Sequence, residues 1–221
     1  MEYTYSEPPL FSSEEVQSLL IKAQGDLANL TNEQYGIVVS SAAKSGVKGM
    51  FDNDGFARAK IVLHNLYRNT KKKVGVYART FTGTLSDSDV VLEGWEECLK
   101  NNPDVFVLID SEPENYTKVF NRICTYINDT KRGKIMVTTP SVRDEIKDYF
   151  KDNNIHYFSL GDDDKVRYEL DNEYRKAWCS FSNKPFSEQL WQILNDAIDK
   201  SDDFVIDFNK LQMAEADLLQ S

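Results

Sequence analysis

The chain has 221 residues, of which 41% are hydrophobic and 12% aromatic, so it can bury a sizeable core and is not globally disordered. Its formal net charge of −10 repels phosphate-rich surfaces, so we expect neither nucleic acid nor a membrane to bind the chain as a whole. No apolar run approaches the roughly 18 residues that a membrane-spanning helix needs.

The first part of the chain, residues 1–70, is expected to form a helical N-terminal extension. Apolar residues recur at helical spacing after an N-cap near Ser12. Thr31 is expected to cap a second helix, which the glycine at Gly46 ends. A third helix is predicted from about residue 54 to residue 69.

The spacing of apolar residues changes at residue 72 from a wholly helical pattern to one that includes short continuous runs. Apolar runs at 74–78, 105–110 and 134–138 alternate with helical patterns, which predicts crossover connections and a parallel sheet. Three later runs with short connections, IHYFSL, VRYEL and AWCSF, predict antiparallel hairpins added to that sheet. The predicted fold is therefore α/β, a mixed and mostly parallel sheet flanked by helices over residues 72–200. Residues 201–221 are expected to be an acidic C-terminal tail, which either packs back on the domain or serves as a docking segment.

Residues 156–183, near the end of this domain, have an order and spacing of residues that is similar to a known sequence motif. This segment resembles the phospholipase D superfamily, whose motif is His-x-Lys, four residues and Asp, followed by a Gly-Ser-x-Asn strand end. His156 and Asp163 have the spacing of the motif, but Phe158 occupies the Lys position. Ser180 stands near the Ser position, and Asn183 follows one residue late. The resemblance is closer to small phospholipase D-like proteins of bacteria and phages than to any lipase.

The resemblance implies a half-site that pairs in a homodimer, where one His attacks phosphorus and the other protonates the leaving group. Phe158 supplies no positive charge for the developing phosphoryl anion. We therefore expect a non-catalytic binding or assembly module, a pseudoenzyme, in a bacterial or phage defence or counter-defence context. The alternative is a homodimeric phosphodiesterase or nuclease in which His156 and Asp163 are catalytic.

A second candidate site follows the first predicted strand, in the loop RTFTGTLS at residues 79–86. Ligands bind open α/β sheets at the carboxyl ends of parallel strands, and a cation with several hydroxyls suits a nucleotide or another small anion. The alternative is a polar connection that ends in the cap of the next helix. The candidate ligand-binding residues are Arg79, Thr80, Thr82, His156 and Ser180.

Neither a metal ion nor a cofactor is expected. Cys98, Cys124 and Cys179 have no metal-ligand spacing and lie in apolar contexts, which is typical of reduced thiols in a cytoplasmic protein. The acidic run at 162–164 is expected to be a hairpin turn, with a relic of the family's Asp or a cation site as the alternative. The expected partners are a second copy of the chain and either a protein or a small anionic ligand.

Overall fold

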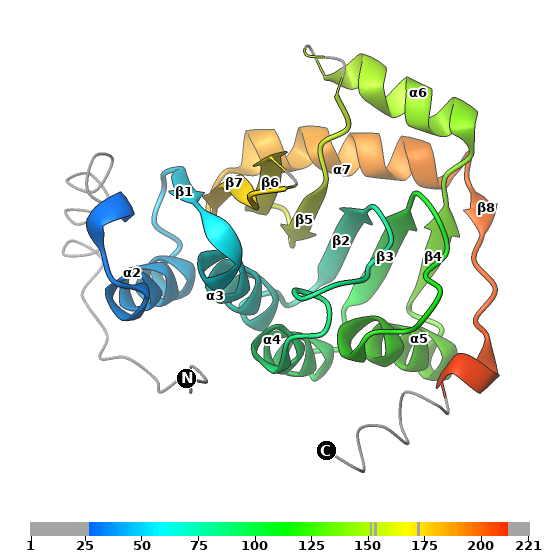
Figure 1. The fold of residues 1–221 in the computed structure, drawn as a ribbon, viewed down its shortest axis with the longest axis horizontal. Coiled ribbons are helices and arrows are strands. Elements are labelled where there is room, and N and C mark those ends of the chain that lie inside the picture. The colour runs from blue at the N-terminus through cyan, green and yellow to red at the C-terminus, as the bar shows by residue number, and fades with distance from the viewer. Residues whose placement is uncertain (1–26, 151, 153, 172, 212–221) are drawn as a thin grey trace.

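The computed structural model describes residues 27–150, 152, 154–171 and 173–211. Within them, eight strands form one mixed sheet in the order β1-β7-β6-β5-β2-β3-β4-β8 (Figure 1). The strands are β1 (Phe51–Asn53), β2 (Lys73–Ala78), β3 (Asp104–Ile109), β4 (Gly133–Val137), β5 (Phe158–Gly161), β6 (Lys165–Asp171), β7 (Lys176–Ser180) and β8 (Asp202–Asp203).

Helices cover both faces of this sheet. They are the short 3-10 helix η1 (Leu27–Asn29), α2 (Asn32–Ser45), α3 (Gly55–Arg68), α4 (Asp89–Leu99), α5 (Lys118–Thr130), α6 (Pro140–Tyr149) and α7 (Lys184–Ile198). One core lies between the sheet and α2 to α5, and a second lies beneath α6 and α7 (Figure 1). Thr31 caps α2 in a capping box, and Gly46 ends it in the left-handed conformation, as predicted. In the described part of the chain, every helix is too short or too polar to cross a bilayer.

The predicted α/β fold with a mixed sheet is confirmed, but the sheet is not mostly parallel, because only two of its seven strand pairings in the described residues are parallel. Strands β2, β3 and β4 are parallel, and Val74 of β2 lies opposite Val105 of β3. Strands β5, β6 and β7 form an antiparallel meander, as their short connections indicated. This meander joins the parallel strands through β5, which lies antiparallel beside β2.

The amino end of the described chain differs from the sequence expectation, and the carboxyl end adopts one of the two alternatives left open for it. The segment before residue 70 is not wholly helical, because β1 pairs with β7 and thereby enters the sheet. The segment after residue 200 packs on the domain, because β8 pairs with β4 and Phe204 contacts Tyr116 and Phe120. The helix predicted after Ser12 and the last residues, 212–221, lie outside the described residues.

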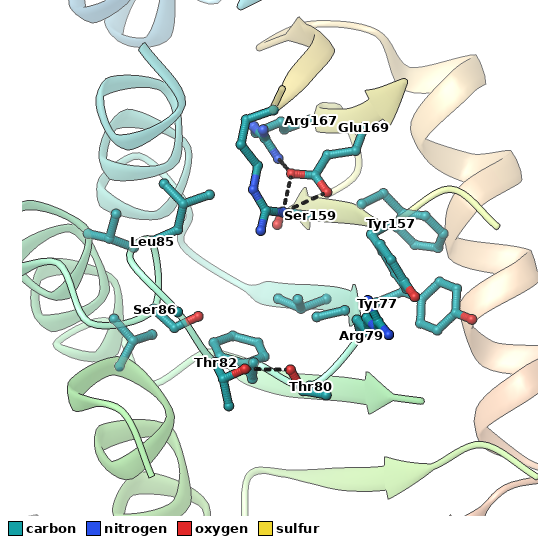
Figure 2. Close-up of a pocket in the computed structure, with 18 of the residues that line it drawn as sticks. Tyr77, Arg79, Thr80, Thr82, Leu85, Ser86, Tyr157, Ser159, Arg167 and Glu169 are labelled. Carbon is teal, nitrogen blue, oxygen red and sulfur yellow. Dashed lines mark hydrogen bonds and ion pairs between the residues drawn. The ribbon is translucent and has the colours of Figure 1, made fainter. Parts of the chain in front are cut away.

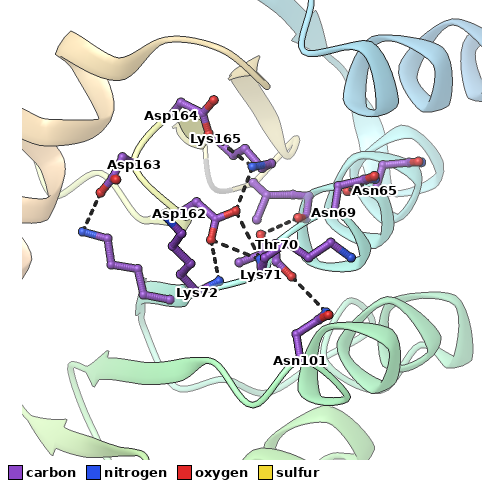
Figure 3. A network of polar contacts seen from close by, with 12 residues as sticks. Asn65, Asn69, Thr70, Lys71, Lys72, Asn101, Asp162, Asp163, Asp164 and Lys165 are labelled. Atoms are coloured by element: carbon purple, nitrogen blue, oxygen red, sulfur yellow. Dashed lines mark hydrogen bonds and ion pairs between the residues drawn. The ribbon is translucent and has the colours of Figure 1, made fainter.

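The turn between β5 and β6 is fixed by Asp162 (Figure 3). Its carboxylate accepts the backbone N–H groups of Lys71 at 3.1 Å and Lys72 at 2.7 Å, just before β2. Lys165 adds an ion pair at 3.0 Å. Burial alone would raise the pKa of Asp162, but the Lys72 N–H and the Lys165 ammonium outweigh it and hold that pKa below its usual value. The predicted turn is therefore present, and through Asp162 it also connects the meander to the residues before β2.

Replacement of Asp162 by Ala should lower the free energy of unfolding by about 2–3 kcal/mol, since hydrogen bonds to a charged group are lost. Asp162 also has a φ of 51°, which Asp tolerates better than Ala. Asp163→Ala is the matched control. Its carboxylate is 55% exposed, and its ion pair with Lys73 should contribute about 0.5 kcal/mol.

Urea denaturation at several pH values checks this prediction. Because the folded pKa of Asp162 is depressed, its stabilisation is present above the unfolded pKa and is lost as the pH falls through the folded pKa. The stability difference between the wild-type and Asp162→Ala proteins should therefore shrink in acid to the pH-independent part that the φ of 51° causes. Equal losses for Asp162→Ala and Asp163→Ala at neutral pH would contradict the assignment.

Candidate functional site

A cavity of about 660 Å³ lies at the carboxyl end of β2, on the side of the sheet that α3, α4 and α5 cover. Its wall includes the loop after β2, residues 79–86, as Figure 2 shows. Trp95 and Tyr67 line it from α4 and α3, and Ser159 lines it from β5. The cavity therefore lies where the parallel strands meet the meander.

The loop after β2 is held by its own aromatic residue. Phe81 adopts a φ of 56° and buries its ring against Phe120, with the ring centroids 5.5 Å apart. The Thr117 hydroxyl donates to the Phe81 carbonyl at 3.1 Å. With Phe81 anchored, the hydroxyls of Thr80 and Thr82 lie 2.6 Å apart on the cavity wall (Figure 2).

The opposite wall holds an ion-pair network. Arg167 of β6 donates from Nη1 to Glu169 at 2.8 Å and from Nε to Asn53 of β1 at 3.0 Å. Arg175 donates from Nη1 to both oxygens of Glu169 at 3.3 Å. The Arg167 and Glu169 side chains (Figure 2) are only 4% and 5% exposed and form a buried pair, whereas Arg175 is 29% exposed.

The charge of the cavity is opposite to that of the chain. Its charged lining consists of three arginines, Arg79, Arg167 and Arg175, and one carboxylate, Glu169, which gives a net charge of +2. The whole chain has a net charge of −10. Arg79 is exposed at the mouth, and no ion pair involves it among the described residues. The arrangement therefore attracts anions to one point of an acidic protein.

Two tyrosines fix the mouth of the cavity. Tyr77 and Tyr157 donate their hydroxyls to the two oxygens of Asp110, at 2.8 and 2.7 Å. Burial, and then the Asp110 carboxylate, raise the pKa of both hydroxyls well above the usual value. Both hydroxyls therefore stay protonated near neutral pH, and the start of β5 is tied to the end of β3.

The structure brings together only part of the predicted ligand site. Arg79, Thr80 and Thr82 line the cavity, whereas His156 and Ser180 are not among its lining residues. The His156 ring is buried and stacks on Tyr168, with the ring centroids 4.9 Å apart. Its nitrogens contact the Glu169 carbonyl at 2.9 Å and Asp152 at 2.8 Å. Ser180 donates to the Gly49 carbonyl at 2.7 Å.

The predicted catalytic residues do not meet either. His156 and Asp163 lie beyond opposite ends of β5, and Asp163 pairs with Lys73 at 2.9 Å, at the amino end of β2. Phe158, at the Lys position of the motif, is 2% exposed and packs edge-on against Tyr77. The spacing that carried the resemblance is therefore spread along a whole strand.

Sequence reasoning missed Arg167, Glu169 and Arg175. The run VRYEL alternates apolar and charged residues, which normally indicates a strand with one face in solvent. Here both faces are covered, because the charged face of β6 lies beneath α3 and the apolar face beneath α7. The alternating charged residues of this run could have indicated a buried ion pair only if the position of α3 above β6 had been known.

In the described part of the chain, no three His, Cys, Asp or Glu side chains are grouped as metal ligands would be. All three cysteines are buried, and burial raises the pKa of each thiol to about 12. They are inert thiols at neutral pH, as expected from the sequence.

No known protein family and no curated protein match the chain in sequence. Among solved structures, the fold is similar to that of Nuc from Salmonella typhimurium, a phospholipase D family member. The two sequences are 13% identical, and the structural alignment covers 72% of this chain and 100% of Nuc at a TM-score of 0.47. It is also similar to TrmBL2, an archaeal chromatin protein, at 8% identity and a TM-score of 0.51 over 86% of this chain and 67% of TrmBL2. At these identities the likeness concerns the fold alone.

Replacement of Glu169 by Gln should lower the free energy of unfolding by about 3–5 kcal/mol, because two arginines lose their counter-charge and Arg167 is buried. Glu173→Gln removes the same charge from an exposed position nearby and should change stability by less than about 0.5 kcal/mol. Chemical denaturation of the two variants checks the prediction. Equal stability of the Glu169→Gln and Glu173→Gln proteins would show that the network contributes nothing to folding.

Proposed function

We propose that the protein is a binding module for a small anionic ligand, of the size and charge of a mononucleotide, in the cavity at the carboxyl end of β2. The observation that carries this proposal is the charge of the cavity, three arginines with one glutamate in a chain of net charge −10. A volume of about 660 Å³ lies within the usual range of small-molecule sites.

The chemistry of the lining supports the same ligand class. Hydroxyls of Thr80, Thr82, Ser86 and Ser159 can donate to anionic oxygens beside the arginines. Aromatic rings of Trp95, Tyr67 and Tyr157 provide apolar surface for the uncharged part of the ligand. Neighbouring anionic and apolar surfaces suit a phosphorylated organic molecule better than a bare ion.

Binding is favoured over catalysis by the position of His156. To act on a ligand, the imidazole would have to leave Asp152 and the Glu169 carbonyl and give up its stacking on Tyr168. The Lys position of the motif holds a core phenylalanine, which cannot stabilise a phosphoryl transition state. We therefore propose a pseudoenzyme role on this α/β scaffold.

Replacement of Arg79 by Ala should weaken nucleotide binding by about ten- to a hundredfold, since a charge-assisted hydrogen bond contributes about 1.5–3 kcal/mol. Titration calorimetry with AMP, ADP and ATP measures the effect. Arg132→Ala is the matched control, because this arginine pairs with Asp104 at the other end of the parallel strands. Arg79→Ala should leave the melting temperature of the free protein unchanged, because Arg79 is exposed. Equal affinities in the Arg79→Ala and Arg132→Ala proteins would refute the site.

Phosphodiester hydrolysis should be absent. Incubation with bis(p-nitrophenyl) phosphate, single-stranded DNA and RNA should release no product above the level of a His156→Ala protein. The two proteins should match because both ring nitrogens of His156 are already engaged. Hydrolysis that the His156→Ala change abolishes would establish the phosphodiesterase in place of the binding module.

A further inference from the structure

The buried end of the cavity contains hydrogen-bond donors without acceptors. Arg167 uses Nη1 and Nε on Glu169 and Asn53, but its Nη2 has no partner among the described residues. The Nε of Arg175 is also buried without a hydrogen-bond partner among these residues. Both arginines line the cavity, and Arg167 is 3% exposed overall. A buried guanidinium N–H without an acceptor is costly, so a ligand oxygen that accepted from it would form a favourable charge-assisted hydrogen bond.

Further donors adjoin Arg167. Ser159 lies directly opposite Arg167 in the β5–β6 pairing. The Ser159 and Tyr67 hydroxyls share one hydrogen bond of 3.0 Å, so one of their two hydrogens remains to be donated. Burial raises the pKa of the Tyr67 hydroxyl to about 12, which keeps it protonated. The buried end therefore offers a fixed guanidinium and hydroxyls, the donor set that holds a phosphate group.

We propose that this buried end binds the terminal phosphate of a phosphomonoester, while the organic part of the ligand lies toward the loop 79–86. The proposal rests on the proposed function and specifies its ligand class. The charges are complementary, since the cavity's net charge of +2 balances the charge of about −2 that a phosphomonoester carries above its second pKa near 6.

The shape of the site selects the same class. Arg167, Tyr67 and Ser159 are all buried, so the phosphate they hold is enclosed on their side. Other lining residues are exposed or half-buried, at Arg79, Thr80 and Thr82 and also at Arg175. A monoester needs one exit for its single substituent, whereas a diester needs two. The site should therefore discriminate against diesters through both geometry and charge.

Titration calorimetry with matched pairs of probes tests the proposal. The pairs are methyl phosphate with dimethyl phosphate, and AMP with 3′,5′-cyclic AMP. We expect each monoester to bind at least about tenfold more tightly than its diester, because the diester loses one charge and one donor contact. Monoester affinity should also rise between pH 5.5 and 7.5, roughly following the second phosphate ionisation near 6.

Two variants locate the effect. Arg167→Lys keeps the charge but lacks the guanidinium fork that can contact Asn53, Glu169 and the ligand together. The ratio of the diester Kd to the monoester Kd should therefore fall toward one. Arg175→Gln, at a partly exposed position, provides the same test if Arg167→Lys fails to fold. Arg175→Gln should weaken the binding of monoesters by about tenfold and the binding of diesters much less.

The outcomes separate the two proposals. Equal binding of monoesters and diesters that still depends on Arg79 would overturn the phosphomonoester site and leave the anion-binding function standing. A monoester preference that survives both Arg167→Lys and Arg175→Gln would place the phosphate elsewhere and also overturn the inference. If no probe in either class binds, the proposed function falls together with the inference.

Discussion

The buried ion pair between Arg167 and Glu169 is the constraint on which the meander depends. Each buried charge must be paired, because removing an ion from water costs several kcal/mol. Here the pairing joins β6 to Asn53 of β1, whose amide in turn donates to the Arg175 carbonyl at 2.8 Å. A slip of β6 by one residue would turn both charges toward α7 and the second core. The pair therefore selects the same register as the apolar residues Val166 and Tyr168, which such a slip would turn out of the second core.

Much of the fold followed from local chemistry. The apolar runs of β2 and β3 were long enough and β-branched enough to be read as buried parallel strands, and the capping residues around α2 marked its ends. Strand β1 was missed because three residues, Phe51–Asn53, carry too little pattern to be distinguished from a linker. Its place in the sheet is set by β7 and by the Asn53 side chain, which are contacts far away in sequence.

The site was predictable only where it depends on local order along the chain. Arg79 and the threonines follow a parallel strand, and that position alone predicted their location at the cavity. Arg167 and Glu169 could not be found in this way, because their role depends on α3 lying above them. His156 misled for the converse reason. Its spacing to Asp163 suggested one site, but an extended strand places two residues seven positions apart beyond its opposite ends.

The outer strands of the sheet bear on how copies of this chain can meet. Within residues 27–211, the sheet ends in β1, with three residues, and in β8, with two, and the latter consists of the exposed Asp202 and Asp203. Short, acidic edges offer few free backbone groups and repel an identical edge, which is how native sheets avoid extending from one molecule into the next. The homodimer expected from the family resemblance stays a prediction. If it forms, helix surfaces or sheet faces must join the two subunits, and the protein should resist strand-mediated fibre growth at high concentration.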